Sequence, residues 1–239
     1  STVAHSIVRL GASLALIAAD HVELQNCDGD VSPMHEGLSK VEAMRRFVRE
    51  SVRPGARIDP RRLSIRDLAA AGAIEQSDVL ISAVDNPIAR RAASIWALAL
   101  LKPHLDIGVG IRESGAEADL RLIPPGMGCI ECLGGAAAAQ VDLPPRPPVL
   151  GLPADFRRER LGSLRSFNVA AGHLGLRMIE QLYSGRLRNA VFRRISEGEH
   201  GDLATRDLVF GHGAAGCTVC AKFLGVGATR AGRYVEQLA

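Results

Sequence analysis

The sequence predicts an α/β fold with a doubly wound, mostly parallel sheet and with antiparallel strands in the second half of the chain. Apolar runs alternate with amphipathic segments through the first half, which is typical of repeated strand–helix units around a parallel sheet. Polar and apolar residues alternate from Ala118 onward, which is typical of an antiparallel strand with one face in solvent. In addition, two Cys-x-x-Cys motifs predict a structural zinc site.

The first half alternates between the two kinds of element. Four amphipathic segments predict helices at residues 1–10, 40–52, 63–71 and 87–101. Three apolar runs predict buried strands at residues 13–18, 78–84 and 105–111. Parallel sheets bind ligands beyond the carboxyl ends of their strands, and Asp20 and Asp85 both follow such strands.

The second half differs in composition. Alternating segments predict strands at residues 118–123, 190–195 and 206–210, and an amphipathic segment predicts a helix at residues 167–183. Residues 134–153 are rich in Ala, Gly and Pro with little periodicity, which predicts a long loop.

Length and charge exclude several classes of protein. The chain has 239 residues, with 47% hydrophobic and 23% charged residues, which is ordinary globular composition and neither disordered nor fibrous. Its longest apolar run, residues 92–101, is shorter than the ~20 residues of a membrane span, and no signal peptide opens the chain. A net charge of +3, with few aromatic residues among the arginine clusters, disfavours nucleic acid and membranes as partners. We therefore expect a soluble, cytoplasmic protein.

Four of the five cysteines form two Cys-x-x-Cys pairs, Cys129 with Cys132 and Cys217 with Cys220. Each pair can supply two thiolates from one tight turn to a tetrahedral Zn²⁺. Four free core thiols, a disulfide and a redox pair are the alternatives. A cytoplasmic disulfide is rare and a redox motif needs one pair only, so the spacing favours zinc. Four thiolates leave no open position, so this metal should hold the fold together.

Three polar features favour a nucleoside triphosphate site. An acidic residue such as Asp20, at the end of an early strand, typically binds ribose hydroxyls. Lys40 is one of three lysines in a chain rich in arginine, and Asp85 and Asn86 lie between a strand and the start of a helix, where phosphates and metal ions bind. Taken singly, each has a plainer interpretation, as an exposed strand end, a solvated lysine and a helix cap.

Three segments resemble the ubiquitin-activating-enzyme-like superfamily of ThiF/HesA/MoeB-type adenylyltransferases. They are residues 20–26 (DHVELQN), residues 37–43 (GLSKVEA), and residues 78–86 (DVLISAVDN) with Arg90 four residues later. The two cysteine pairs are similar to the zinc site of that family, and residues 162–168 (GSLRSFN) resemble the segment after its crossover loop. The resemblance covers nearly the whole chain, and within it we favour a bacterial member.

The resemblance implies a Rossmann-like fold and one adenylation domain over residues 1–239. Residues 1–123 would form its nucleotide-binding half, and residues 124–239 would hold the zinc and the crossover loop. A doubly wound domain usually starts with a strand and a glycine-rich loop, whereas this chain starts on a helix. We expect both either to lie in residues that this sequence does not include or to have been lost. The family also implies a homodimer.

The implied reaction is ATP-dependent adenylation of a C-terminal carboxylate. The carboxylate would belong to a ubiquitin-like or sulfur-carrier-like protein, or to a peptide, and a ubiquitin-conjugating-type enzyme is an implied further partner. Asp20 would bind the ATP ribose, and Asn26 and Lys40 would contact the triphosphate. Asp85, next to Asn86, would help to hold Mg²⁺. Lys40, Asp85 and Asn26 are therefore the predicted catalytic residues.

The sequence departs from the family pattern at two places and leaves two other functions open. Gly29 stands where the family has an arginine three residues after Asn26, and residues 134–153 contain no cysteine to act as a thioester nucleophile. Cys27 is better explained as a small buried residue. A non-catalytic subunit of the same fold is the first alternative. A nicotinamide-dependent oxidoreductase is the second, although it gives Lys40, Asp85 and the cysteine pairs no role.

Overall fold

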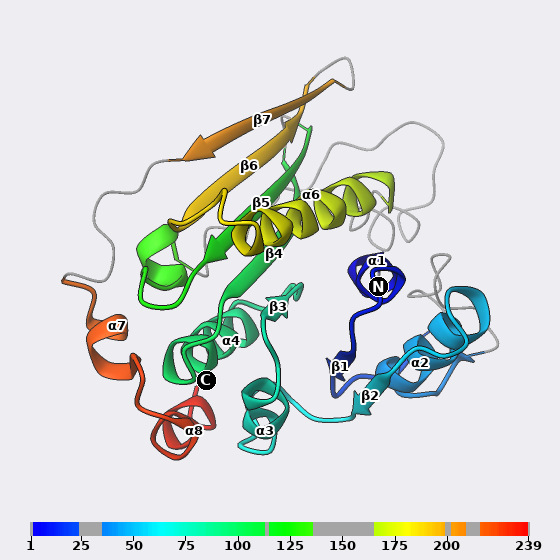
Figure 1. The fold of residues 1–239 in the computed structure, drawn as a ribbon, viewed down its shortest axis with the longest axis horizontal. Coiled ribbons are helices and arrows are strands. Elements are labelled where there is room, and N and C mark those ends of the chain that lie inside the picture. The colour runs from blue at the N-terminus through cyan, green and yellow to red at the C-terminus, as the bar shows by residue number, and fades with distance from the viewer. Residues whose placement is uncertain are drawn as a thin grey trace, which may run out of the picture.

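In a computed structural model, the described residues form two β-sheets and the helices that cover them (Figure 1). The structure describes residues 2–23, 35–112, 115–135, 165–198, 202–208 and 216–238. Among these residues, no helix is both long and apolar enough to cross a membrane.

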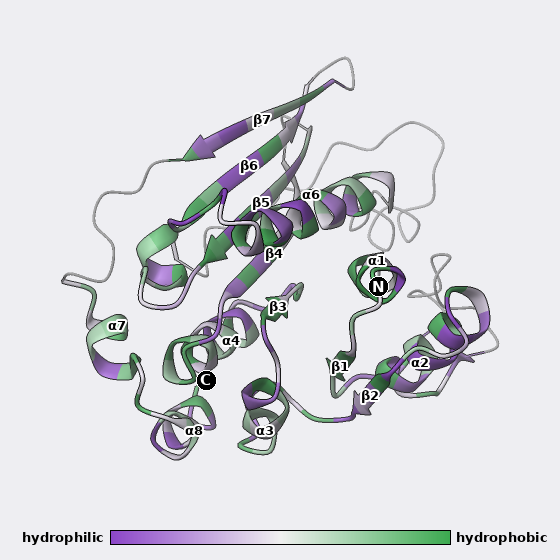
Figure 2. Cartoon of the chain, in the orientation of Figure 1, coloured by the Kyte–Doolittle hydropathy of each residue, from purple (hydrophilic) through white to green (hydrophobic). Residues whose placement is uncertain are grey.

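The first sheet has two parallel strands, β1 (Leu14–Ile17) and β2 (Ile58–Arg61). Helices α1 (Thr2–Arg9) and α2 (Lys40–Ser51) contact it and share with it a small apolar core. Green and purple segments alternate along α2 in Figure 2, as expected of a helix with one buried face. The predicted helices 1–10 and 40–52 and strand 13–18 are confirmed. Strand β2 was not predicted, because Asp59 and Pro60 interrupt its apolar pattern.

The predicted helix at residues 63–71 is wrong. Turns occupy most of that segment, and α3 runs instead from Ala70 to Glu75. The Asp67 carboxylate accepts a hydrogen bond from the Ser64 N–H at 2.8 Å, and the Ser64 hydroxyl accepts one from the Arg66 N–H at 3.1 Å. These side chains satisfy backbone donors locally and so stabilise turns in place of a helix.

The second sheet has five strands in the order β3-β4-β5-β6-β7. They are β3 (Leu80–Ser82), β4 (His104–Arg112), β5 (Gly115–Ile123), β6 (Val191–Glu197) and β7 (Leu203–Leu208). Strands β3 and β4 are parallel, whereas the three later pairs are antiparallel. All five overlap predicted strands, and the antiparallel second half is confirmed.

The sheet is not mostly parallel among the described residues. Two of the five strand pairs are parallel, and both lie in the first half of the chain. The cause is the connection between β4 and β5, which spans two residues. So short a link can join antiparallel neighbours only, because a parallel pair needs a crossover of a dozen residues or more.

Helix α6 (Arg165–Tyr183) lies across the second sheet beside α1 (Figure 1) and confirms the helix predicted at 167–183. Its close approach to the sheet depends on Gly175. A Cβ atom at this position would lie 3.0 Å from the Ile107 side chain and 3.2 Å from that of Leu105. Any larger residue would therefore push the helix away from β4.

Helix α4 (Pro87–Ala99) lies in the middle of the largest apolar core and confirms the helix predicted at 87–101. Its Trp96 is fully buried, with the indole N–H donating to the Ile65 carbonyl at 2.7 Å. Two C-terminal helices, α7 (Thr218–Phe223) and α8 (Ala228–Val235), pack against α4. They were not predicted, because they are too short to show a clear helical periodicity.

Candidate functional site

Asp20 and Lys40 are in direct contact, although twenty positions separate them. The Lys40 Nζ lies 3.1 Å from the Asp20 Oδ2, and the Lys40 N–H donates to the Asp20 carbonyl at 2.9 Å. The Val22 N–H also donates to the Leu38 carbonyl at 2.8 Å. The chain that leaves β1 therefore runs beside the residues that begin α2, and this pairing holds the predicted ribose and triphosphate residues together.

The charge at this contact suits an anionic ligand. Lys40 is the first residue of α2, where the helix dipole already carries positive partial charge. The side chains of Lys40 and Asp20 are 40% and 71% exposed, so their ion pair is screened by water and contributes at most ~1 kcal/mol. A polyphosphate could therefore replace Asp20 as the partner of Lys40 at little cost in stability.

Asn86 is a helix cap, as its plainer interpretation predicted. Its Oδ1 accepts hydrogen bonds from the N–H groups of Ile88 at 2.8 Å and Ala89 at 3.4 Å, and Pro87 has no N–H to offer. The first turn of α4 is thus satisfied within the chain and is poorly suited to bind phosphate. The exposed carboxylate of Asp85 is what this turn presents to a ligand, and carboxylate oxygens suit Mg²⁺.

Strands β1 and β3 share one core. Ile17, the last residue of β1, and Leu80, the first residue of β3, both pack against the apolar cluster around α4. Asp20 follows β1, and Asp85 follows β3. Asn26, Cys27 and Gly29 lie outside the described residues, as do residues 136–153 of the predicted loop.

A buried network of charges behind the Asp85 turn was not predicted. Its centre is Asp106 on β4, which is fully buried. The Asp106 Oδ2 accepts hydrogen bonds from Arg90 at 3.1 Å and Arg121 at 2.9 Å, and its Oδ1 accepts one from the Ser82 hydroxyl at 2.8 Å. Buried charges require such partners, because an unpaired one would cost several kcal/mol.

Arg121 extends the network toward the cysteine cluster. It donates to Asp119 at 3.3 Å and to the Leu133 carbonyl at 3.1 Å, and its guanidinium lies 4.4 Å from the centroid of the Phe192 ring. Arg194 also donates to Asp119, at 2.8 Å. The sequence does contain a signal for this network. Charged residues lie inside strands that are otherwise apolar, a pattern that is rare unless the charges are paired.

His104 is neutral at the edge of this network. Ser82 donates its hydroxyl hydrogen to Asp106, so its oxygen accepts from the His104 Nε2 at 2.8 Å, which assigns the ring proton to Nε2. Burial lowers the pKa of His104 to about 4; Asp106 opposes this shift, and the charges of Arg90 and Arg121 add to it.

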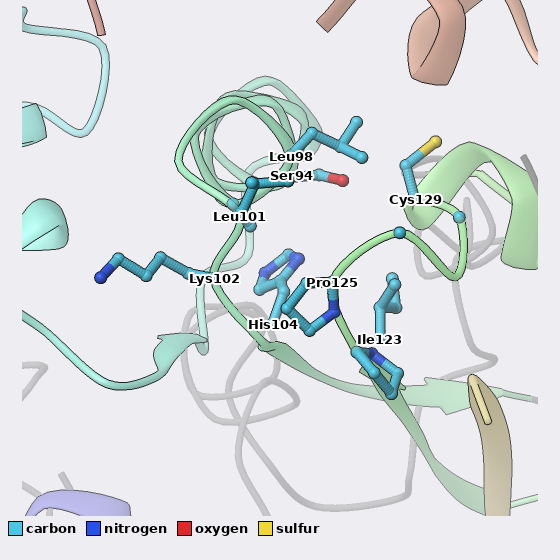
Figure 3. Close-up of a pocket in the computed structure, with 12 residues that line it drawn as sticks. Ser94, Leu98, Leu101, Lys102, His104, Ile123, Pro125 and Cys129 are labelled. Carbon is cyan, nitrogen blue, oxygen red and sulfur yellow. The ribbon is translucent and has the colours of Figure 1, made fainter. Parts of the chain in front are cut away.

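The His104 ring faces a small cavity, shown in Figure 3 with Ser94, Leu98, Lys102 and Pro125 among its lining residues. Among the described residues, the His104 Nδ1 has no hydrogen-bond partner. The cavity measures about 10 Å³, which is room for about one water molecule and far too small for a nucleotide. It is therefore not the nucleotide site.

The buried state of His104 predicts a loss of stability in mild acid. In the unfolded chain the imidazole takes a proton near pH 6.5, but in the fold only near pH 4, so the unfolded state binds more protons between these values. The contribution of His104 is complete above pH 6.5, and about 3 kcal/mol of it is lost as the pH falls to 4.

Urea unfolding of the wild type and of His104→Gln between pH 7.5 and 5 measures this loss. The Gln amide can still donate toward Ser82 but does not titrate. The free energy of unfolding of this variant should therefore fall less steeply with decreasing pH than that of the wild type. His173→Gln, at an exposed position of α6, is the control and should keep the wild-type slope. If the free energy of unfolding depends on pH equally in the wild type and in His104→Gln, His104 is not the group that causes the loss of stability in acid.

The four paired cysteines converge as predicted. The Sγ atoms lie 3.8 Å apart for Cys129 and Cys132, 3.8 Å for Cys129 and Cys217, and 3.6 Å for Cys132 and Cys220. All four lie within 4.8 Å of one another. Sulfurs bound at ~2.3 Å to a tetrahedral zinc lie about 3.8 Å from one another, so the spacing fits zinc closely. It is too long for a disulfide.

The same packing makes these thiols unsuited to act as nucleophiles. Burial raises the pKa of Cys129 to about 12 and that of Cys220 still further. For Cys217, burial also opposes ionisation, but hydrogen bonds from the backbone of Cys220 and Val219 and from neighbouring thiols outweigh it and lower the pKa. A divalent cation would stabilise all four thiolates at once.

The cluster is tied to α4. Cys129 is the N-cap of the short helix η3 (Ile130–Leu133), and Cys132 lies within that helix. The Ile130 N–H donates to the Ser94 hydroxyl at 3.1 Å. Arg91 forms an ion pair with Glu131 at 3.3 Å. Helix α7 carries the second pair to the same core, so the cluster joins three segments that are distant in the sequence.

Comparisons with known proteins show the family and the fold. A sequence profile described as the ThiF family matches residues 1–151. Among solved structures, E. coli MccB with ATP is 17% identical with a TM-score of 0.64, over 92% of this chain and 62% of MccB. The microcin C7 biosynthetic enzyme MccB with N-formylated MccA is 17% identical with a TM-score of 0.64, over 92% of this chain and 63% of that one.

A third structure, of PaaA, is 15% identical with a TM-score of 0.54, over 87% of this chain and 60% of PaaA. This chain thus spans less than two thirds of the length of these proteins. At such identities the likeness shows a shared fold. No curated protein sequence matches the chain significantly.

Proposed function

Because the chain belongs to the ThiF family, we propose that it uses ATP to adenylate the C-terminal carboxylate of a peptide or of a ubiquitin-like protein. The observation that carries the proposal is the contact between Asp20 and Lys40. In it, the carboxylate that is proposed to bind ribose lies beside a cation at the start of a helix. The MccB structures with ATP and with N-formylated MccA support the binding of ATP and of a second molecule by this fold.

In the proposed reaction, an oxygen of the substrate carboxylate attacks the α-phosphorus of ATP. The bond to the bridging oxygen breaks, and the products are an acyl-adenylate and pyrophosphate. Asp20 accepts hydrogen bonds from the ribose hydroxyls and thereby releases Lys40. Lys40 then neutralises the charge that builds on the departing pyrophosphate. Asn26 is proposed as a further phosphate contact.

Asp85 is the proposed ligand for Mg²⁺, which would withdraw charge from the phosphates of ATP. Asn86 contributes indirectly, because its carboxamide oxygen already caps α4. The protein supplies little covalent chemistry in such a step. Its contribution is to place the carboxylate, the phosphates and the opposing charges in line.

The four cysteines are proposed to hold one structural zinc ion. Their spacing fits a ZnS₄ tetrahedron, and thiolate ligands suit zinc. Four protein ligands leave no position for substrate, so this metal would stabilise the fold. The reaction would take place near Asp20 and Lys40.

Two calorimetric titrations, one with ATP and Mg²⁺ and one with NAD, test which class of nucleotide the protein binds. We expect ATP to bind and NAD to show no measurable heat, because Lys40 and Asp85 suit a triphosphate and a cation. Lys40→Ala should weaken ATP binding, whereas the control Lys222→Ala, which changes a lysine 4.1 Å from the Tyr234 ring centroid, should not. Binding of NAD without ATP would favour an oxidoreductase.

A further inference from the structure

The chain leaves the sheet just before Asp85, and the side chain of Arg90 occupies the place where it leaves. Strand β3 pairs with β4 as far as Ser82, opposite Asp106. Beyond this point β4 continues alone on this side. Arg90 donates from Nη2 to the Ile107 carbonyl of β4 at 3.2 Å and from Nε to the Val84 carbonyl at 2.8 Å. The guanidinium thus bridges the strand and the departing turn.

The guanidinium is held in place from two further sides. Its Nη1 donates to Asp106 at 3.1 Å, and the side chain is 4% exposed. It also lies flat against Gly108, where a Cβ atom would approach Nη1 to 2.5 Å and Nη2 to 2.8 Å. A residue larger than glycine would displace the guanidinium. The planar fork of arginine reaches three acceptors in different directions, which a single lysine ammonium cannot do.

We propose that Arg90 is a positioning residue for Asp85. By holding the Val84 carbonyl, Arg90 fixes the backbone immediately before Asp85 and sets the direction in which that carboxylate meets a cation bound to ATP. The inference rests on the proposed function, because it assumes that Asp85 serves Mg²⁺. Residues that orient a ligand through its backbone or side chain typically change metal affinity 10–100-fold when they are lost.

Arg121 provides a matched control. It is fully buried and donates to the same Asp106 oxygen, but its other partners are Asp119 and the Leu133 carbonyl, away from the Asp85 turn. Loss of either arginine should lower the melting temperature. Only loss of Arg90 should loosen the turn.

The experiment compares the wild type with Arg90→Lys, Gly108→Ala and Arg121→Lys. Gly108→Ala keeps the charge of Arg90 but pushes its guanidinium aside, so it serves if Arg90→Lys does not fold. Hydrogen exchange of a peptide covering residues 83–88 reports on the turn without any nucleotide. Electron paramagnetic resonance with Mn²⁺ and ATP as probes reports the affinity of the site for the metal nucleotide.

We expect Arg90→Lys and Gly108→Ala to exchange about tenfold faster over residues 83–88 and to bind Mn²⁺·ATP about 10–100-fold more weakly. Arg121→Lys should change either quantity less than about twofold. Equal effects of Arg90→Lys and Arg121→Lys, or no effect of Arg90→Lys on either readout, would overturn the positioning role. A wild type that does not bind Mn²⁺·ATP would instead refute the proposed function, and the positioning role with it.

Discussion

Replacing Cys217 with serine is expected to weaken metal binding at the proposed zinc site and to destabilise the fold. A serine hydroxyl does not ionise at neutral pH and is a poor zinc ligand, so three thiolates would remain. The binding free energy of a structural zinc is about 10–16 kcal/mol for four ligands, so one ligand accounts for roughly 3 kcal/mol. In a chain of this length that loss lowers the melting temperature by about 6–12 °C.

Elemental analysis and thermal unfolding measure the two effects together. The wild type should hold about one equivalent of zinc. Cys27→Ser is the control, since Cys27 belongs to neither pair, and it should retain both metal and stability. Less than about half an equivalent of metal in carefully prepared wild type would contradict a zinc site of four thiolates.

The cluster of four cysteines could be predicted because its geometry is largely local. Each Cys-x-x-Cys turn places two sulfurs side by side, and the only long-range requirement is that the two turns meet. The main strands and helices could be predicted for a similar reason, since the apolar residues of α4 and of α2 repeat over several turns. Short elements such as β2, α7 and α8 contain too few residues to show a period.

The buried charges depend on contacts that no local pattern reveals. Asp106 and Arg121 face each other because β4 and β5 pair in one register, with Asp106 opposite Arg121. A shift of one strand by one residue would turn one of these two side chains to the other face of the sheet and separate the pair. The place of Arg90 likewise depends on where β3 ends and on a glycine in a different strand. The sequence shows these residues but not their pairing.

The candidate site falls between these cases. The strand-end positions of Asp20 and Asp85 follow from the order of strands and helices. The ion pair between Asp20 and Lys40 does not, because it depends on the path of the chain between β1 and α2. Asn86 shows how one residue type can serve two purposes, since its amide could bind a ligand or cap a helix. The hydrogen bonds to Ile88 and Ala89 identify the cap.

Lys40→Ala is expected to reduce the exchange of labelled pyrophosphate into ATP by about 10²-fold or more. Exchange requires both directions of the proposed step: a carboxylate displaces pyrophosphate from ATP, and labelled pyrophosphate then attacks the acyl-adenylate. Lys40 opposes the charge of pyrophosphate in both directions. Loss of one such preorganised charge typically raises the barrier by several kcal/mol. Because the ion pair with Asp20 is exposed, the variant should fold normally.

Three further variants help to interpret the effect of Lys40→Ala on exchange. Asp85→Ala should also slow exchange strongly, but added Mg²⁺ should partly restore it, because that variant weakens cation binding. Cys27→Ser should leave exchange intact, since adenylation precedes any thioester. Lys222→Ala controls for loss of a lysine elsewhere. The wild type could bind ATP but support no exchange with peptides or ubiquitin-like proteins that end in a free carboxylate. That result would favour the hypothesis that the chain is a non-catalytic subunit. In that case Gly29, at the position where the family has an arginine, would belong to a site that still binds ATP but no longer catalyses adenylation.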